Sequence, residues 1–110
     1  MFDRASQLRR LAGSLEELVV ILRRDTTCGW TRGFESMLSE AQSLQSTQFR
    51  QDDLNLLSGS VTSVFGGMGS FNDYVPHEGN RIASWIAEFD EVRGRVYEDA
   101  FSLRVIGNRA

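Results

Sequence analysis

The sequence predicts an all-α protein: an antiparallel four-helix bundle with a structured glycine-rich loop between its third and fourth helices. Apolar residues recur at the spacing i, i+3, i+4, i+7 in several long segments, which is typical of amphipathic helices. The first connections are short, and short connections favour antiparallel neighbours. Residues 57–76 interrupt the pattern with Gly66, Gly67 and Gly69 and mark the loop.

Composition narrows the class of protein. A chain of 110 residues fits one helical domain, residues 1–110. The net charge of −3 argues against a nucleic-acid partner and suits a basic protein partner. The single cysteine, Cys28, cannot form an internal disulfide, and no segment reaches the roughly 20 apolar residues of a membrane span. We therefore expect a cytoplasmic protein with no membrane partner.

The first helix is expected over residues 2–24. Asp3 is the candidate N-cap, because a carboxylate there accepts hydrogen bonds from free backbone amides. Gly13 costs about 1 kcal/mol relative to alanine inside a helix. It either admits a close neighbouring helix or is simply tolerated. The predicted buried face consists of Leu8, Leu11, Ala12, Leu15, Leu18, Val19 and Leu22.

The second helix is expected over residues 30–45, with Thr27 as its candidate cap. Its apolar face is narrow, which indicates a helix on the outside of the bundle. That face consists of Trp30, Phe34, Met37, Leu38, Ala41 and Leu44.

The third helix is expected over residues 54–65, capped by Asp52 or Asp53. Its remaining side chains are small, which allows close packing and favours a central position. A strand over residues 61–65 is the alternative, because valine and threonine favour extended structure.

The loop that follows is expected to be ordered. Gly66 and Gly67 end the helix and Gly69 allows a second turn, because glycine adopts positive φ without strain. We expect the polar side chains of Ser70, Asn72 and Asp73 to bond the loop's own backbone rather than an ion. We expect four apolar side chains to fix the loop on the bundle: Met68, Phe71, Tyr74 and Val75.

The last helix is expected to begin near Asn80 and to end near Val105, with Gly107 just beyond its end. Gly94 is expected to bend it. Its predicted buried face consists of Ile82, Trp85, Ile86, Phe89, Val92, Val96, Tyr97, Ala100 and Leu103.

No motif in the chain carries a specific chemistry. His77 is the one histidine, and no second ligand stands at a metal-binding spacing from it, so we expect no metal and no cofactor. Cys28, next to a helix start, is either a reactive thiol or a small buried side chain. The spacing of Gly66 and Gly69 lacks the rest of a nucleotide fingerprint. Paired acids such as Asp90 and Glu91 indicate a solvated face or an acidic docking face.

The run Phe65-Gly66-Gly67-Met68-Gly69-Ser70-Phe71-Asn72-Asp73 resembles a motif of an uncharacterised family of small bacterial cytoplasmic proteins. The similarity covers residues 53–100. In size and style such proteins resemble the immunity proteins that neutralise bacterial toxins. The resemblance implies a co-encoded partner.

The leading hypothesis is a non-catalytic protein-binding module, specifically an immunity protein that covers the functional site of a basic, co-encoded toxin. Met68, Phe71, Asp73 and Tyr74 would contact the partner, because aromatic residues dominate interface energetics. The alternative is a small ligand-binding or hydrolytic protein that uses residues 66–76 with His77. A homodimer through the last helix is the third hypothesis.

Overall fold

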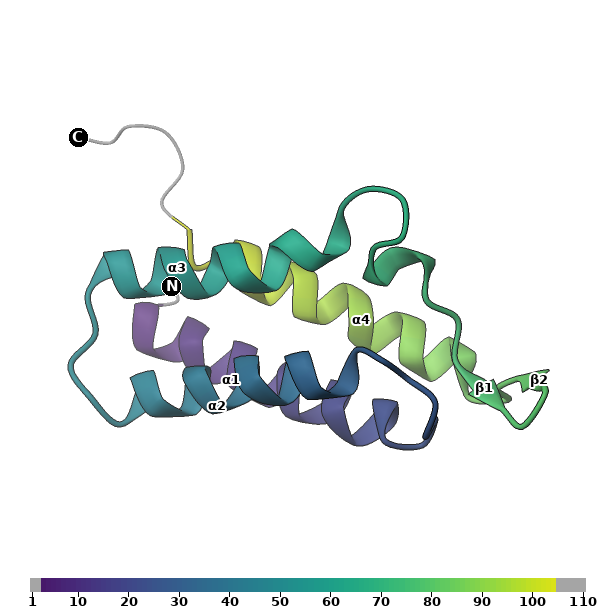
Figure 1. Cartoon of the computed structure of the whole chain (residues 1–110). Coiled ribbons are helices and arrows are strands. Elements are labelled where there is room, and N and C mark those ends of the chain that lie inside the picture. The colour runs from purple at the N-terminus through teal and green to yellow at the C-terminus, as the bar shows by residue number, and fades with distance from the viewer. Residues whose placement is uncertain (1–2, 105–110) are drawn as a thin grey trace.

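The computed structural model describes residues 3–104, which form a mostly helical protein with four α-helices and a small two-stranded sheet (Figure 1). Helix α1 contacts both α2 and α4, and α3 contacts both α4 and α2. Among the described residues, no helix combines the length and the apolarity needed to cross a lipid bilayer. The helices are α1 (Arg4–Leu22), α2 (Thr31–Gln45), α3 (Gln51–Thr62) and α4 (Ile86–Phe101).

One hydrophobic core joins the four helices. Its apolar positions on α1 include all those that the helical spacing predicts, and Ile21 in addition. Each large side chain removed from water contributes about 1.5–3 kcal/mol before the entropy of ordering is counted. The fully buried leucine, valine and phenylalanine side chains of the four helices are Leu8, Leu11, Leu15, Leu18, Val19, Leu22, Phe34, Leu54, Leu57, Val61, Phe89 and Val96.

Helix α1 begins as the sequence predicts and is slightly shorter. The carboxylate of Asp3 caps it by accepting a hydrogen bond of 2.7 Å from the backbone N–H of Ser6. The expected start at Phe2 lies outside the described residues, and the helix ends at Leu22. A Cβ atom added to Gly13 would meet nothing within 4 Å, so close approach of a neighbouring helix does not explain that glycine.

The predicted caps of the next two helices are wrong. The hydroxyl of Thr27 donates a 2.6 Å hydrogen bond to Asp25, and α2 begins only after Trp30. Helix α3 begins one turn earlier than predicted, after Arg50. Asp53 lies in its first turn and accepts a 2.8 Å hydrogen bond from the backbone N–H of Arg50, where a carboxylate also favours the helix dipole.

The strand alternative for residues 61–65 is also wrong. Helix α3 continues as the 3₁₀ turn η1 (Ser63–Phe65), and Val61 and Phe65 are buried in the core. The β-branched residues are accommodated because this helix packs against α2 and α4, and tertiary packing overrides their weak local preference.

The predicted start of the last helix near Asn80 is wrong. The chain instead forms an antiparallel hairpin of β1 (His77–Glu78) and β2 (Arg81–Ile82), with His77 opposite Ile82. Gly79 has a φ of +64°, so the Gly-Asn pair forms the tight turn. The backbone N–H of Ala83 donates to the carbonyl of Pro76 at 2.9 Å and closes the hairpin.

The hairpin projects from one end of the molecule, beside the start of α4 (Figure 1). Ile82, expected in the buried face, is 61% exposed there. Helix α4 ends at Phe101, and the expected end at Val105 and the expected glycine at Gly107 lie outside the described residues.

Candidate functional site

The loop between η1 and β1 contains the 3₁₀ turn η2 (Phe71–Asp73) and is shaped by two glycines. Gly67 and Gly69 have φ values of +80° and +75°, in the region that L-amino acids avoid. Gly66 is extended, with a φ of −108°. In Figure 1 the loop rises from the end of α3 and returns to the surface of α4.

The polar side chains of the loop bond its own backbone. The carboxylate of Asp73 accepts a 2.6 Å hydrogen bond from the N–H of Gly69, and the hydroxyl of Ser70 accepts one of 3.2 Å from the N–H of Asn72. The side-chain amide of Asn72 donates to the carbonyl of Phe65. One carboxylate oxygen of Asp73 is therefore already committed inside the protein.

The expectation that Phe71 contacts a partner is wrong, because this ring is fully buried. It forms the centre of an aromatic cluster, with ring centroids between 4.6 Å and 5.9 Å from those of its neighbours. Those neighbours are Trp30, Phe34, Phe65, Tyr74 and Phe89. Phe71 therefore fixes the loop to the core.

Met68 does the opposite. The prediction that it fixes the loop is wrong, because its side chain is 93% exposed. Val75, expected beside it as an anchor, is also exposed. A methionine presented to solvent from a tightly bonded loop is available to a partner.

Tyr74 is half-buried, and its hydroxyl is used inside the protein. It donates a 2.6 Å hydrogen bond to Asp25, in the turn after α1. The same carboxylate, 5% exposed, also accepts hydrogen bonds from the backbone N–H and hydroxyl of Thr27 and from the backbone N–H of His77. Asp25 therefore ties the loop to the α1–α2 turn.

The charge of the buried Asp25 carboxylate depends on the groups that donate hydrogen bonds to it. Burial alone raises the pKa of Asp25, but the four hydrogen bonds that it accepts outweigh burial and lower that pKa from 3.8 to about 2. Burial and the neighbouring carboxylate raise the pKa of the Tyr74 phenol above its ordinary value. Asp25 is therefore ionised and Tyr74 is protonated near neutral pH.

Arg93 holds the loop from the opposite side. Its guanidinium donates 3.1 Å hydrogen bonds to the carbonyls of Phe71 and Tyr74 and also pairs with Asp90. It lies 4.6 Å from the centroid of the Phe89 ring, a cation–π distance. The loop is thus bonded both to the α1–α2 turn and to α4.

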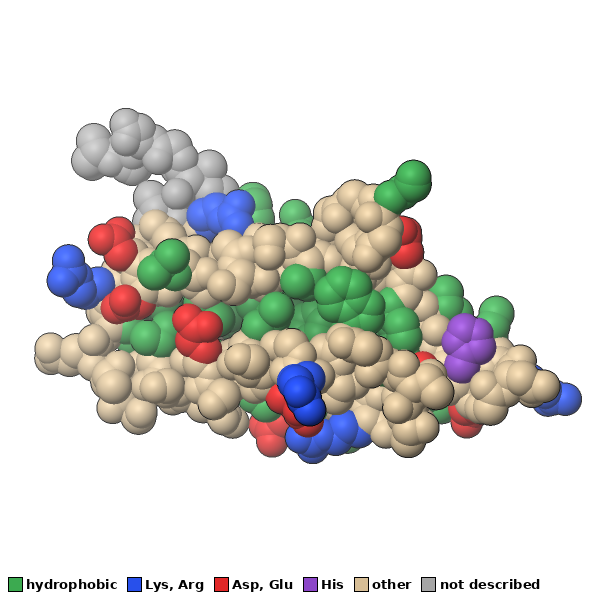
Figure 2. Space-filling model, in the orientation of Figure 1, with side chains coloured by type: hydrophobic (Ala, Val, Ile, Leu, Met, Phe, Trp, Pro, Cys, Tyr) green, Lys and Arg blue, Asp and Glu red, His purple; other side chains and the backbone are tan. Residues whose placement is uncertain are grey.

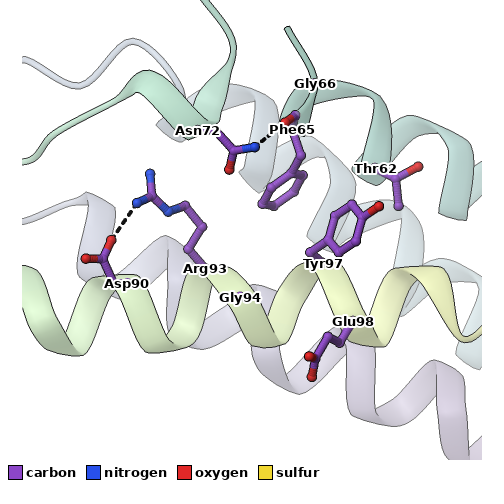
Figure 3. Close-up of a pocket in the computed structure, with 9 residues that line it drawn as sticks. All are labelled: Thr62, Phe65, Gly66, Asn72, Asp90, Arg93, Gly94, Tyr97 and Glu98. Carbon is purple, nitrogen blue, oxygen red and sulfur yellow. Dashed lines mark hydrogen bonds and ion pairs between the residues drawn. The ribbon is translucent and has the colours of Figure 1, made fainter.

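A groove of about 550 Å³ opens between η1, the loop and α4 (Figure 3). Its aromatic side chains pack edge to face, with the ring centroids of Phe65 and Tyr97 5.2 Å apart. No atom lies within 4 Å of a Cβ built on Gly66 or Gly94, so these glycines leave the groove open. It is lined by Thr62, Phe65, Gly66, Asn72, Asp90, Arg93, Gly94, Tyr97 and Glu98.

Apolar side chains continue beyond the groove. Tyr97 stacks on Phe101 with centroids 6.2 Å apart, and each is 40% exposed.

Figure 2 shows a further band of hydrophobic side chains between α2 and α3. The partly buried hydrophobic residues of α2 are Met37, Leu38 and Leu44.

Of the loop residues singled out from the sequence, Gly66 and Asn72 line the groove, but the residues that α4 contributes to it were not recognised as site residues. The spacing of Tyr97 to Ala100, three residues on, predicts a buried position for Tyr97, but the ring is 40% exposed. The sequence predicts only a bend at Gly94, which lines the groove. The sequence signal for this part of the groove is the pair Tyr97 and Phe101, four residues apart. These two aromatic residues make the apolar face of α4 wider than packing against one core requires.

The two residues with the most reactive side chains lie apart from the groove. The sulfur of Cys28 accepts a 3.4 Å hydrogen bond from the N–H of Trp30, and the side chain packs against the core. The exposed ring of His77 lies 2.9 Å, through Nδ1, from the carbonyl of Val75. Within residues 3–104 no three His, Cys, Asp or Glu side chains are grouped so as to hold a metal ion.

Comparison with known proteins identifies the family. No curated protein and no solved structure matches the chain. A family model described as "Domain of unknown function (DUF6966)" matches residues 23–84, from the end of α1 through the loop to the hairpin. The match spans more than half of the 110 residues, so the chain belongs to the DUF6966 family.

Proposed function

We propose that this chain is a non-catalytic protein-binding module, an immunity protein that neutralises a bacterial toxin by covering its functional site. The observation that carries the proposal is the exposure of large apolar side chains on the loop and on α4: Met68 on the loop, and the stacked pair Tyr97 and Phe101, of which Tyr97 lines the groove. Exposed apolar patches commonly mark interaction sites.

The scaffold suits this role. The contacts of α1 with α2 and α4, and of α3 with α2 and α4, support an antiparallel four-helix bundle. The bonds of the loop to Asp25 and Arg93 fix its backbone before a partner binds. A preformed surface loses little entropy on association, which favours tight binding. We place this activity in the cytoplasm.

Charge supports a basic partner. The chain carries a net charge of −3, and α4 contributes five acids against two arginines. Complementary fields accelerate encounter and discriminate against wrong partners. The toxin surface is therefore expected to be basic where it meets α4.

The test is co-expression with the product of each neighbouring toxin-like gene, scored by cell growth and by recovery of a one-to-one complex. The double variant Tyr97→Ser with Phe101→Ser should abolish protection. The control is Val20→Ser, which removes a 51% exposed apolar side chain from α1 that does not line the groove. Failure of every neighbouring product to bind, or equal protection by the double variant, would overturn the proposal.

A small-ligand protein is the second candidate, and the groove volume favours it. Pockets of roughly 300–1,000 Å³ hold small molecules, and this groove measures about 550 Å³. The residues expected to do chemistry, Asp73 and His77, do not line it. Thermal-shift screening with metabolites separates the candidates, because a ligand in the groove would raise the melting temperature without any protein partner.

A further inference from the structure

We propose that the groove binds a guanidinium group, namely an arginine side chain supplied by the protein partner. This inference rests on the proposed function and specifies its chemistry. It follows from the polar groups left in the groove, the aromatic wall beside them and the open space above Gly94.

The polar groups still available are mostly hydrogen-bond acceptors. Asp90 uses one carboxylate oxygen for Arg93 and is 52% exposed. Asn72 uses its amide N–H for the carbonyl of Phe65, and its amide oxygen points into the groove (Figure 3). Within residues 3–104 no group donates to that oxygen or to the carboxylate of Glu98. A ligand rich in donors would satisfy these acceptors.

The cations at the groove are already bonded. Arg93 is directed to the loop carbonyls and to Asp90. Arg104 donates a 2.8 Å hydrogen bond to the hydroxyl of Thr62 at the other end of the groove. The groove therefore presents acceptors and negative charge, and among its described cations Arg93 bonds one carboxylate oxygen of Asp90 and leaves the other oxygen available.

Aromatic rings in this protein repeatedly hold guanidinium groups. Arg104 lies 5.3 Å from the centroid of Phe101, and Arg24 lies 5.4 Å from that of Trp85. Tyr97 lines the groove, stacks on Phe101 and is 40% exposed. A planar guanidinium packs against an exposed aromatic surface of this kind better than an ammonium does.

Gly94 leaves space in the groove for a guanidinium group. It follows Asp90 by four residues and precedes Glu98 by four, so the three lie on one stripe of α4. Glu98 points away from the loop, toward the outer rim (Figure 3). Asp90 and Asn72 would therefore contact the guanidinium, and Glu98 would attract the basic segment that carries it.

The experiment is an NMR titration of the full ¹⁵N-labelled chain with hexa-arginine and, separately, with hexa-lysine. Hexa-arginine should shift the amides of Gly66, Gly94 and Tyr97 and should bind about tenfold more tightly than hexa-lysine. Shifts spread evenly over the acidic surface, or equal affinity for the two peptides, would overturn the proposal.

A filling variant tests the site without removing a structural contact. Gly94→Leu places a side chain in open space and improves a helix position, so the protein should stay folded. Gly94→Leu should weaken hexa-arginine binding about tenfold, because the leucine side chain fills the space in the groove that the guanidinium would occupy. The matched control is Gly33→Leu, also inside a helix and facing open space, which should bind as the natural chain does.

The outcomes separate this inference from the proposed function. If a toxin partner binds Gly94→Leu as tightly as the natural chain, the guanidinium site is wrong and the immunity role stands. If hexa-arginine binds at Gly94 and Tyr97 while no neighbouring product is neutralised, the site stands and the immunity role is wrong.

Discussion

Replacing the buried carboxylate of Asp25 by an amide should reveal how the loop is held. Asp25 accepts four hydrogen bonds, two of them from the loop and hairpin through Tyr74 and His77. Asp25→Asn keeps the shape of the side chain, removes its charge and turns one of its two accepting oxygens into a donating amide. The lost acceptor lowers the stability of the variant at every pH, so the charge is tested by the part of the difference that changes with pH.

The structure gives the size and the direction of the effect. The pKa of Asp25 falls from 3.8 to about 2 on folding, and each pKa unit corresponds to about 1.4 kcal/mol. The ionised group thus contributes about 2 kcal/mol to the free energy of unfolding. Because the folded-state pKa is the lower one, this contribution is complete above pH 5 and is lost as the pH falls toward 2.

Urea unfolding at pH 7, 5, 3 and 2, followed by circular dichroism, measures the contribution of ionised Asp25 to the free energy of unfolding. The difference in unfolding free energy between the natural chain and Asp25→Asn should shrink by about 2 kcal/mol between pH 7 and pH 2. Comparing the two chains cancels the titration of the other carboxyl groups, and Glu40→Gln on the exposed face of α2 is the control. A difference that stays constant over this range would refute the reasoning.

Four further substitutions test the fold by urea unfolding. Phe71→Ala should lower the free energy of unfolding by about 3–5 kcal/mol, because it empties the centre of the core. A decrease below about 1 kcal/mol would contradict the buried position of Phe71. Gly67→Ala should lower the free energy of unfolding by about 1–2 kcal/mol because Gly67 has a positive φ, whereas Gly66→Ala, in extended backbone, should lower it much less. Equal decreases for the two variants would contradict the loop geometry. Gly94→Ala should gain about 1 kcal/mol, since its Cβ meets open space, and a loss would show that the groove is closed.

The helices could be predicted because their faces repeat along the chain. Leu8, Leu11 and Leu15 show the buried face of α1 without knowledge of any other element, since each turn of the helix brings the next leucine to the same side. The hairpin could not be found in this way. Its signal is the pair Gly79 and Asn80 between strands of two residues, too short for an alternating pattern to appear.

The roles of the loop residues depend on distant contacts. Phe71 and Met68 are both large and apolar and stand three positions apart, yet one is fully buried and the other is 93% exposed. Their roles are set by the 3₁₀ turn that directs Phe71 inward, by Arg93 on α4 and by Asp25 in the turn after α1. No local pattern in residues 66–76 contains that information.

The same contacts determine where a partner can bind. The hydrogen-bonding groups of Tyr74, Asp73 and Arg93 are used in holding the loop, so a toxin that competed for them would have to break bonds inside the protein. Near the loop and on α4, exposed apolar side chains free of such bonds include Met68, Tyr97 and Phe101. A partner that covers these side chains leaves the loop unchanged. For that reason α4 and the tip of the loop, rather than the body of the loop, are where recognition should be sought.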